Sequence, residues 1–253
     1  MLLKIYQSKV REGERSWHYP TKVPEADRKA LQHHRPFLKG LAEDGGLFMP
    51  TEIPKLDKTL EQLAGMTYQE TAYEVMKLFL TDYTEEELKS CIANAYDDKF
   101  DTEEIAPLAK ADGAYFLELY HGSTIAFKDM ALSILPHLMT TAAKKNHADK
   151  EIVILTATSG DTGKAAMAGF ADVPGTRIIV FYPKGGVSKV QELQMRTQKG
   201  DNTSVVAIHG NFDDAQTGVK KLFGNKELER KWQRLASSSL PQTLLTSDVW
   251  FHR

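Results

Sequence analysis

One lysine follows a short apolar segment at a position where a lysine is unexpected. Lys128 lies in His121–Asp129 (HGSTIAFKD), between a predicted strand and a helix rich in apolar residues. The start of a helix carries partial positive charge and apolar neighbours disfavour an ammonium, so both effects favour the neutral amine. A neutral lysine amine can form a Schiff base with a carbonyl compound. The alternative is a surface lysine whose ammonium stays in water.

A second loop combines glycines with hydroxyl side chains. It runs from Thr156 to Gly163 (TATSGDTG), directly after a predicted buried strand. Backbone N–H groups and hydroxyls around the start of a helix suit an oxyanion, either a carboxylate or a phosphate. An ordinary Ser, Thr or Asp helix cap explains the same residues equally well. The loop lacks the spacing of the phosphate-binding P-loop and of the GxGxxG motif.

Alternating strands and helices are expected to position both loops. This alternation predicts right-handed crossovers and a parallel sheet, in which ligands bind beyond the carboxyl ends of the strands. Pro136 lies inside the first predicted helix and should bend it. The predicted strands are Tyr115–Tyr120, Glu151–Thr156, Arg177–Tyr182 and Ser204–Ile208, and the predicted helices are Phe127–Ala143, Asp161–Phe170, Ser188–Thr197 and Asp213–Phe223.

The preceding part of the chain is predicted to be mostly helical. Apolar residues recur at helical spacing between Tyr68 and Leu80, and Thr84 begins a capping box with the glutamates that follow it. We therefore expect an α/β protein with two domains. A mostly helical N-terminal domain, residues 1–100, would precede a parallel-sheet α/β domain, residues 101–236.

The composition excludes several classes of protein. The chain has 253 residues and a net charge of −2, whereas nucleic-acid-binding proteins normally carry a net basic surface. No apolar run approaches the roughly 18 residues that span a bilayer, and the N-terminus has no apolar stretch typical of a signal peptide. We expect a cytoplasmic protein that binds neither nucleic acid nor membrane. The single cysteine, Cys91, cannot form an internal disulfide or a thiolate cluster, and no metal site is predicted.

The two loops together resemble those of threonine synthase. That enzyme uses pyridoxal 5'-phosphate (PLP) and shares its fold with tryptophan synthase β-chains and serine/threonine dehydratases. The first loop is similar to the family pattern HGPT-hydrophobic-AFKD, with Ser123 in place of the usual proline, which removes a restraint on φ. The segment ATSGDTG, Ala157–Gly163, matches the second family motif. The resemblance continues in YPKGGVSKVQELQM (Tyr182–Met195), HGNFDDAQTGVKKLF (His209–Phe223) and LKGLAEDGGLFMPTEIP (Leu38–Pro54).

The resemblance implies a function for each loop. Threonine synthases convert O-phospho-L-homoserine and water into L-threonine and phosphate. Lys128 is expected to carry PLP as an internal aldimine and to move protons between substrate carbons, while the cofactor acts as the electron sink. Asp161 should turn its carboxylate away from the bound anion and cap its own helix through Gly163 or Lys164. The expected donors to the substrate carboxylate are Thr158, Ser159, Gly160, Asp161 and Thr162.

Two neighbours of Lys128 each have two interpretations. Phe127 packs either against the cofactor ring or in the hydrophobic core, and the core position is favoured. His121 contacts either a substrate phosphate or hydroxyl, or is a turn histidine hydrogen-bonded to the backbone. The turn interpretation is favoured for His121.

The last residues of the chain differ from the family. Family members are much longer, and the glycine- and asparagine-rich loop that binds the cofactor phosphate has no match here. Back-translation of Gln242–Arg253 (QTLLTSDVWFHR), read two bases in, allows Asn-Ser-Ile-Asn-Ile-Gly-Arg-Leu-Val-Pro-Gln, which is the run that the family has at this place. Residues 237–253 are therefore interpreted as a frameshifted tail, and the fold as incomplete at its C-terminus.

This interpretation of the tail carries its own expectation. The chain as written should be inactive, and a single-base correction near Ala236–Ser239 should restore threonine formation. Two other functions stay open: a PLP-dependent dehydratase of the same fold, and a non-catalytic remnant that binds no cofactor. The stretches YPKGGVSKVQ and GNFDDAQTGV favour the synthase over the dehydratase. The sequence predicts no oligomeric state.

Overall fold

The structure is a computed structural model that describes residues 53–147, 151–225 and 227. The similar N-terminal segment Leu38–Pro54 lies almost entirely outside these residues, and so does the predicted frameshifted tail. The predicted domain boundaries at residues 100 and 236 stay predictions.

Three short helices open the described part of the chain. They are α3 (Leu60–Ala64), α4 (Tyr68–Met76) and α5 (Glu85–Ala95). Each begins with a threonine that accepts a hydrogen bond from a backbone N–H in the first turn, while a Gln or Glu side chain accepts from the N–H of that threonine. The helical prediction and the capping box at Thr84 are confirmed. The capping threonines are Thr59, Thr67 and Thr84.

Helix α5 packs against α7 (Leu135–Lys145), which lies much later in the chain. Their contact is a hydrophobic cluster that includes Leu88 and Ile92 of α5 and Leu138 of α7. Tyr83 donates its hydroxyl to the Leu138 carbonyl at 2.9 Å. Burial raises the pKa of Tyr83, so the phenol keeps the proton that it donates. The helices before residue 100 therefore share a core with helices after it.

The expected parallel sheet is present. Its strands lie in the order β3 (Ile152–Ala157), β4 (Thr176–Pro183) and β5 (Thr203–Ile208). Both pairs are parallel, with Ile152 opposite Thr176 and Ile178 opposite Thr203. The three strands predicted after residue 150 are thus confirmed.

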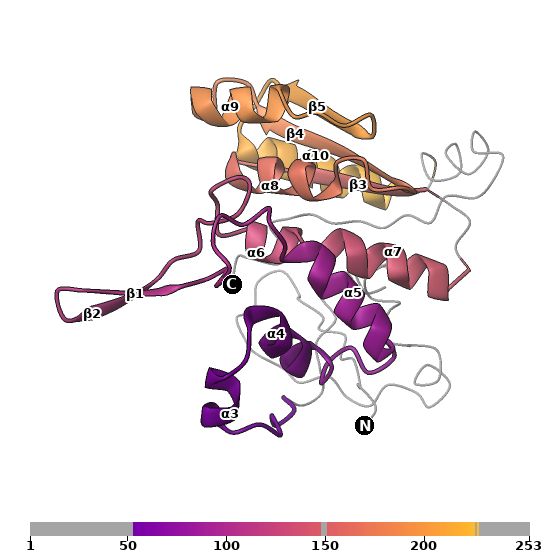
Figure 1. Cartoon of the computed structure of the whole chain (residues 1–253). Coiled ribbons are helices and arrows are strands. Elements are labelled where there is room, and N and C mark those ends of the chain that lie inside the picture. Colours follow the sequence, from indigo (N-terminus) through magenta and orange to yellow (C-terminus); the bar gives the residue numbers. More distant parts are fainter. Residues whose placement is uncertain (1–52, 148–150, 226, 228–253) are drawn as a thin grey trace, which may run out of the picture.

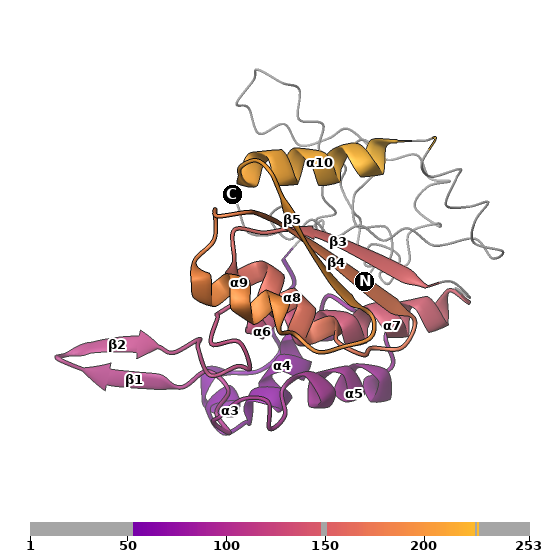
Figure 2. The same cartoon turned by 90° about the horizontal axis from the view of Figure 1, so that it is seen from above.

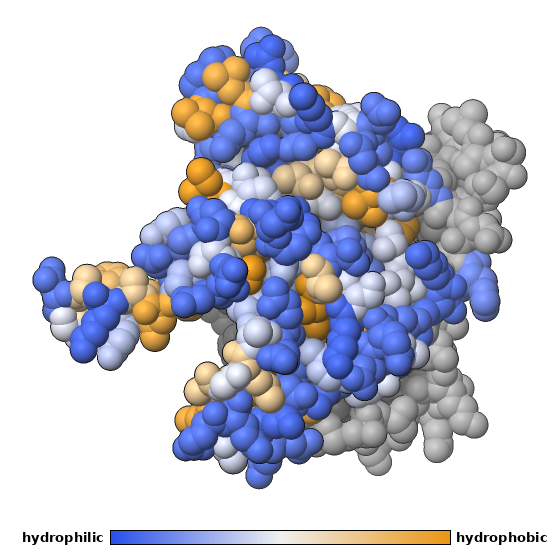
Figure 3. Space-filling view, in the orientation of Figure 1, coloured by the Kyte–Doolittle hydropathy of each residue, from blue (hydrophilic) through white to orange (hydrophobic). Residues whose placement is uncertain are grey.

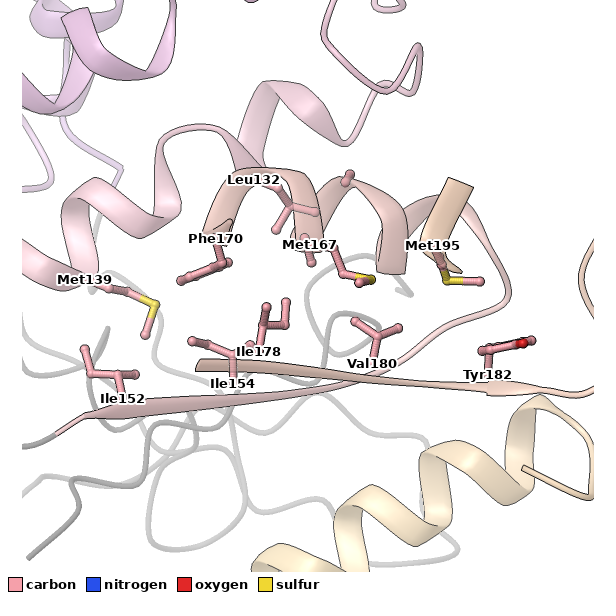
Figure 4. Close-up of a cluster of buried hydrophobic side chains, with 12 residues drawn as sticks. Leu132, Met139, Ile152, Ile154, Met167, Phe170, Ile178, Val180, Tyr182 and Met195 are labelled. Carbon is pink, nitrogen blue, oxygen red and sulfur yellow. The ribbon is translucent and has the colours of Figure 1, made fainter. Parts of the chain in front are cut away.

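Helices cover both faces of this sheet (Figures 1 and 2). Helices α8 (Asp161–Phe170) and α9 (Lys189–Arg196) lie on one face, and α10 (Phe212–Gly224) lies on the other. All three agree with the predicted helices. Figure 4 shows the core under α8 and α9, where side chains of β3 and β4 meet those of the helices. Its fully buried members include Ile154, Met167, Phe170, Ile178, Val180 and Met195.

The predicted helix Phe127–Ala143 is two helices, α6 (Asp129–Leu132) and α7. Pro136 lies in the first turn of α7, where its missing N–H costs no helical hydrogen bond. The helix is therefore interrupted at Ser133 and Ile134, where a bend was expected. The break allows α8 to approach closely. A Cβ at Gly169 of α8 would overlap the carbonyl oxygen of Leu132, so only glycine fits there.

The predicted strand Tyr115–Tyr120 does not join the parallel sheet. The strand β2 (Ala114–Leu117) pairs with β1 (Leu108–Ala111) in an antiparallel hairpin that projects from the molecule (Figure 1). Asp112 and Gly113 both have positive φ, +49° and +77°, as a tight two-residue hairpin turn requires. The apolar run indicated burial, but Tyr115 and its neighbours on β2 are exposed, and Figure 3 shows apolar side chains on this hairpin.

Candidate functional site

The two predicted loops lead into helices that lie side by side. Helix α6 follows the Lys128 loop, α8 follows the second loop, and α6 packs against α8. Asp129, the first residue of α6, acts electrostatically on Lys164 in the first turns of α8, and Leu132 contacts Gly169 near the other end of α8. The two helices therefore run in the same direction, and their amino ends lie at the same edge of the fold.

A buried carboxylate organises the Lys128 loop. Asp129 is only 3% exposed, and its Oδ2 accepts the N–H of Thr124 at 2.8 Å while Oδ1 accepts the Thr124 hydroxyl at 2.6 Å. Gly122 packs against this side chain, because a Cβ at that position would lie 2.6 Å from Oδ2. The N–H of Ile125 donates to the Gly122 carbonyl at 3.0 Å and closes a turn. The loop shape before Lys128 is therefore set by Asp129.

Lys128 lies close to the start of a helix, as predicted, and it immediately precedes α6 instead of lying within the helix. Its side chain is partly buried, and its Nζ lies 5.3 Å from the centre of the Phe127 ring. Phe127 is 49% exposed, so the favoured core position of this residue is wrong. The Phe127 ring therefore lies beside the Lys128 ammonium at the surface instead of entering the core.

A buried hydroxyl organises the second loop. Thr158 is fully buried, and its Oγ1 accepts the N–H groups of Gly160 at 3.0 Å and of Gly163 at 2.8 Å. The N–H of Thr158 itself donates to the Phe181 carbonyl at 2.9 Å. The backbone N–H groups of Thr158 and Gly160 are therefore engaged inside the protein, and they are the weakest members of the predicted donor set.

Three other N–H groups of the predicted set are left for a ligand. Within the described residues, the N–H groups of Ser159, Asp161 and Thr162 have no protein acceptor. They lie at the amino end of α8, a helix of 10 residues, where the helix dipole favours an anion. Gly160 separates two of these donors with φ of +143°, a conformation that L side chains rarely adopt.

The Asp161 carboxylate does not cap its own helix. Its Oδ1 accepts a hydrogen bond of 2.7 Å from the side-chain amide of Gln191, on α9. The expectation that Asp161 caps α8 through Gly163 or Lys164 is wrong, because a donor far along the chain takes the carboxylate instead. Sequence reasoning missed Gln191 altogether. The available signal was the capping-box pattern from Ser188 to Gln191, which places Gln191 at the amino end of α9.

Two further side chains near the loops have charged neighbours. The His121 ring lies between two carboxylates, with Nδ1 at 2.5 Å from Asp101 and Nε2 at 2.9 Å from Glu118. These hydrogen bonds, chiefly that to Glu118, raise the pKa of His121. The favoured interpretation, a ring hydrogen-bonded to the backbone, is therefore wrong. Burial lowers the pKa of Lys164, and the nearby Asp129 carboxylate opposes that shift.

Other kinds of site find no support in the described ranges. No cluster of three His, Cys, Asp or Glu residues there is arranged to hold a metal ion. No helix of this part of the chain combines the length and apolarity needed to cross a membrane.

Comparisons with known proteins agree with the predicted resemblance. Residues 20–96 match the family described as threonine synthase N terminus. The threonine synthase of Eremothecium gossypii is 35% identical over 230 residues, which cover 85% of this chain and 45% of that protein. The threonine synthase of Pseudomonas aeruginosa is 36% identical over 230 residues, which cover 88% of this chain and 48% of that protein. The chain therefore spans about half the length of these relatives.

Solved structures give the same picture. The PLP-bound threonine synthase of Brucella melitensis matches with a TM-score of 0.73 and 33% identity over 87% of this chain and 46% of its own. The yeast threonine synthase matches with a TM-score of 0.74 and 31% identity over 86% of this chain and 44% of its own. The predicted resemblance and the predicted fold, incomplete relative to these enzymes, are confirmed.

Proposed function

We propose, from the relation of this chain to the N-terminal part of threonine synthases, that it supplies the lysine and the carboxylate-binding loop of such an enzyme. The substrate would be O-phospho-L-homoserine, and the products L-threonine and phosphate. One observation carries the proposal: α6 and α8 run side by side, with Lys128 at the amino end of one and three N–H donors at the amino end of the other. The expected cytoplasmic location remains a prediction.

The residues at this edge fit PLP in part. Lys128 would hold the cofactor through Nζ, since it is partly buried and lies beside an aromatic ring. When bound, PLP supplies an electron sink for the substrate carbon that loses a proton. Residues that would bind the cofactor phosphate are not assigned within the described ranges.

The chain's own groups divide the remaining work. The Lys128 amine, close to the substrate Cα, would accept a proton there and return it at another carbon. The N–H groups of Ser159, Asp161 and Thr162 would orient the substrate through its carboxylate, since fixed orientation lowers the barrier to proton transfer. The Asp161 carboxylate is held by Gln191, so it does not itself occupy these N–H groups.

Chemical labelling tests the lysine assignment. The 253-residue protein is incubated with PLP, reduced with borohydride and digested, and the labelled peptide is identified by mass spectrometry. The expected label is on Lys128, and Lys128→Ala should abolish it. Lys164→Ala is the matched control, because Lys164 is the neighbouring amine whose pKa burial lowers. A label on Lys164 or on any other lysine would overturn the assignment.

Substitution tests the loop in a form whose predicted reading frame is restored. Ser159→Ala and Thr162→Ala remove hydroxyls beside the N–H donors, and each lost hydrogen bond to a charged group should cost about 1.5–3 kcal/mol in kcat/KM. The cofactor absorbance should not change, because neither residue touches Lys128. Unchanged kcat/KM in both variants would show that the two hydroxyls do not bind the substrate carboxylate, and would leave that role to the backbone N–H groups alone.

If the chain is a non-catalytic remnant, the labelling experiment should give a different result. A remnant retains no PLP, so it shows neither a reducible label nor the cofactor absorbance near roughly 410–420 nm. The dehydratase alternative is separated by its product. It releases a 2-oxo acid from serine or threonine, whereas the proposed synthase releases phosphate from O-phospho-L-homoserine.

A further inference from the structure

The side chain of Gln191 joins the amino ends of two helices. Its carbonyl oxygen accepts the N–H of Ser188 at 3.1 Å, which completes the capping box of α9. Its NH₂ group donates to Oδ1 of Asp161, the first residue of α8, at 2.7 Å. Both ends of the amide are therefore engaged, one in its own helix cap and one on the neighbouring helix.

The same amide covers Gly160. A Cβ built at Gly160 would overlap the Cδ, Nε2 and Oε1 atoms of Gln191, so the amide lies directly on the glycine Cα. Gly160 stands between Ser159 and Asp161, whose N–H groups have no protein acceptor within the described residues. Gln191 is thus in contact with the centre of the segment that presents these donors.

The hydrogen bond from Gln191 also fixes the position of the Asp161 carboxylate, an anion that could compete with a bound ligand. A carboxylate in the first turn of a helix is attracted by the exposed N–H groups at that end. In the structure the Asp161 carboxylate is instead held by Gln191, and the first-turn N–H groups of Asp161 and Thr162 stay available. Without the donor on Gln191, the carboxylate is expected to turn back and occupy them.

We propose that Gln191 is a positioning residue that holds the Asp161 carboxylate away from the N–H groups of Ser159, Asp161 and Thr162. This assignment rests on the proposed function, which gives those groups to the substrate carboxylate. Gln191 does not touch the substrate. Its NH₂ group keeps the Asp161 carboxylate from competing with the substrate carboxylate for these N–H groups.

The variant Gln191→Glu isolates the donor. Glutamate keeps the acceptor that caps α9 and keeps the cover over Gly160, but it replaces the NH₂ donor with a second carboxylate that repels Asp161. The double variant Gln191→Glu, Asp161→Asn restores one hydrogen bond with the roles reversed, because the introduced asparagine amide then donates to the introduced glutamate. Gln198→Glu is the matched control, since Gln198 lies just beyond α9 and contacts Lys164 instead of Asp161.

The test uses the ¹⁵N-labelled 253-residue protein titrated with L-threonine, whose carboxylate serves as the probe. Binding is followed through the amide signals of Ser159, Asp161 and Thr162. We expect saturable shifts in the original protein, at least about fivefold weaker binding in Gln191→Glu, and binding within about twofold of the original in Gln198→Glu. The double variant should regain most of the lost affinity, because it no longer contains the competing Asp161 carboxylate; no such recovery is expected if Gln191 only covers Gly160.

Each other outcome has a defined meaning. Unchanged affinity in Gln191→Glu, or no recovery in the double variant, overturns the positioning role while leaving the carboxylate site in place. Absence of saturable shifts in the original protein overturns the proposed carboxylate site, and the role of Gln191 with it. Thermal unfolding of every variant is recorded, so that a loss of folded protein is not counted as a loss of affinity.

Discussion

The Lys128 loop and the second loop (Thr156–Gly163) each lead into a helix, but chemically different groups accept the hydrogen bonds that fix their shapes. In the first, the buried Asp129 carboxylate takes the hydrogen-bond donors of Thr124 into the protein. In the second, the neutral hydroxyl of Thr158 accepts two N–H groups, and within the described residues the N–H groups of Ser159, Asp161 and Thr162 have no protein acceptor. A charged acceptor therefore fixes the shape of the Lys128 loop, whereas a neutral acceptor fixes the shape of the second loop.

The largest loss of stability should come from removing the Asp129 carboxylate. Asp129→Ala leaves the buried Thr124 N–H and hydroxyl without an acceptor, and this should lower the free energy of unfolding by about 3 kcal/mol. Asp161→Ala is the control, because Asp161 is also the first residue of its helix but is exposed. Its effect should stay near 0.5 kcal/mol, about the range for exposed substitutions. Urea unfolding measures both, and similar losses would remove the contrast between the loops.

Removing the Thr158 hydroxyl should cause the next largest loss of stability. Thr158→Val keeps the shape of the side chain but leaves the N–H groups of Gly160 and Gly163 unsatisfied, at a cost of about 2 kcal/mol. Thr158→Ser keeps the hydroxyl and loses only a methyl group, so it should cost less. Urea unfolding ranks the two variants. Equal losses would show that Thr158 stabilises the loop through packing alone.

A substitution in the Lys128 loop should stabilise the protein. The hydrogen bond from Ile125 to Gly122 places Ser123 at the second position of a turn, where proline is favoured. Ser123→Pro should raise the free energy of unfolding by about 0.5–1 kcal/mol, because it restricts the unfolded chain. Ser123→Ala should change it little, since the side chain is exposed. Destabilisation by proline in urea unfolding would show that this turn differs from the one described.

The smallest effect concerns the pH response at the start of the Lys128 loop. Hydrogen bonds to Glu118 and Asp101 raise the pKa of His121 above its unfolded value, so their stabilisation is complete below that value and is lost as pH rises through the raised pKa. Glu118→Gln should lower the pKa of His121, as measured by NMR titration of the ring. The pKa of His137, which burial lowers, should not move. An unchanged His121 pKa would mean that Asp101 alone determines it.

Local sequence patterns predicted the helices and strands better than they predicted which residues contact one another. The strands of the parallel sheet and helix α8 were predicted nearly to the residue, because apolar runs and a Ser/Thr/Gly loop are local signals. The hairpin was missed because an apolar run reports preference for burial, whereas the Asp112–Gly113 turn fixes the pairing. The position of Lys128 near the start of a helix was also predicted, although the helix begins two residues later than expected, and the role of Lys128 stays a prediction.

The site was predicted less completely because its hydrogen bonds join distant residues. Asp161 and Gln191 are 30 positions apart, and Asp101 and His121 are 20 positions apart. No periodicity or spacing connects such pairs, since they meet only after the helices pack. The predictions for Asp161 and His121 failed through contacts of this kind, whereas the prediction for Phe127 failed because an apolar residue type does not by itself ensure burial.

The packing of α5 against α7 has a consequence for synthesis on the ribosome. The hydroxyl of Tyr83 bonds a carbonyl 55 positions later, and Glu87 pairs with Lys145, 58 positions later. The apolar face of α5 can contact α4 as soon as both helices have formed, but its contacts with α7 must wait until α7 has left the exit tunnel. The strands and helices from β3 to β5 connect neighbours in the chain and can assemble as they emerge. The apolar face of α5 is therefore fully buried only after translation through Lys145, and a chaperone would bind it during this interval.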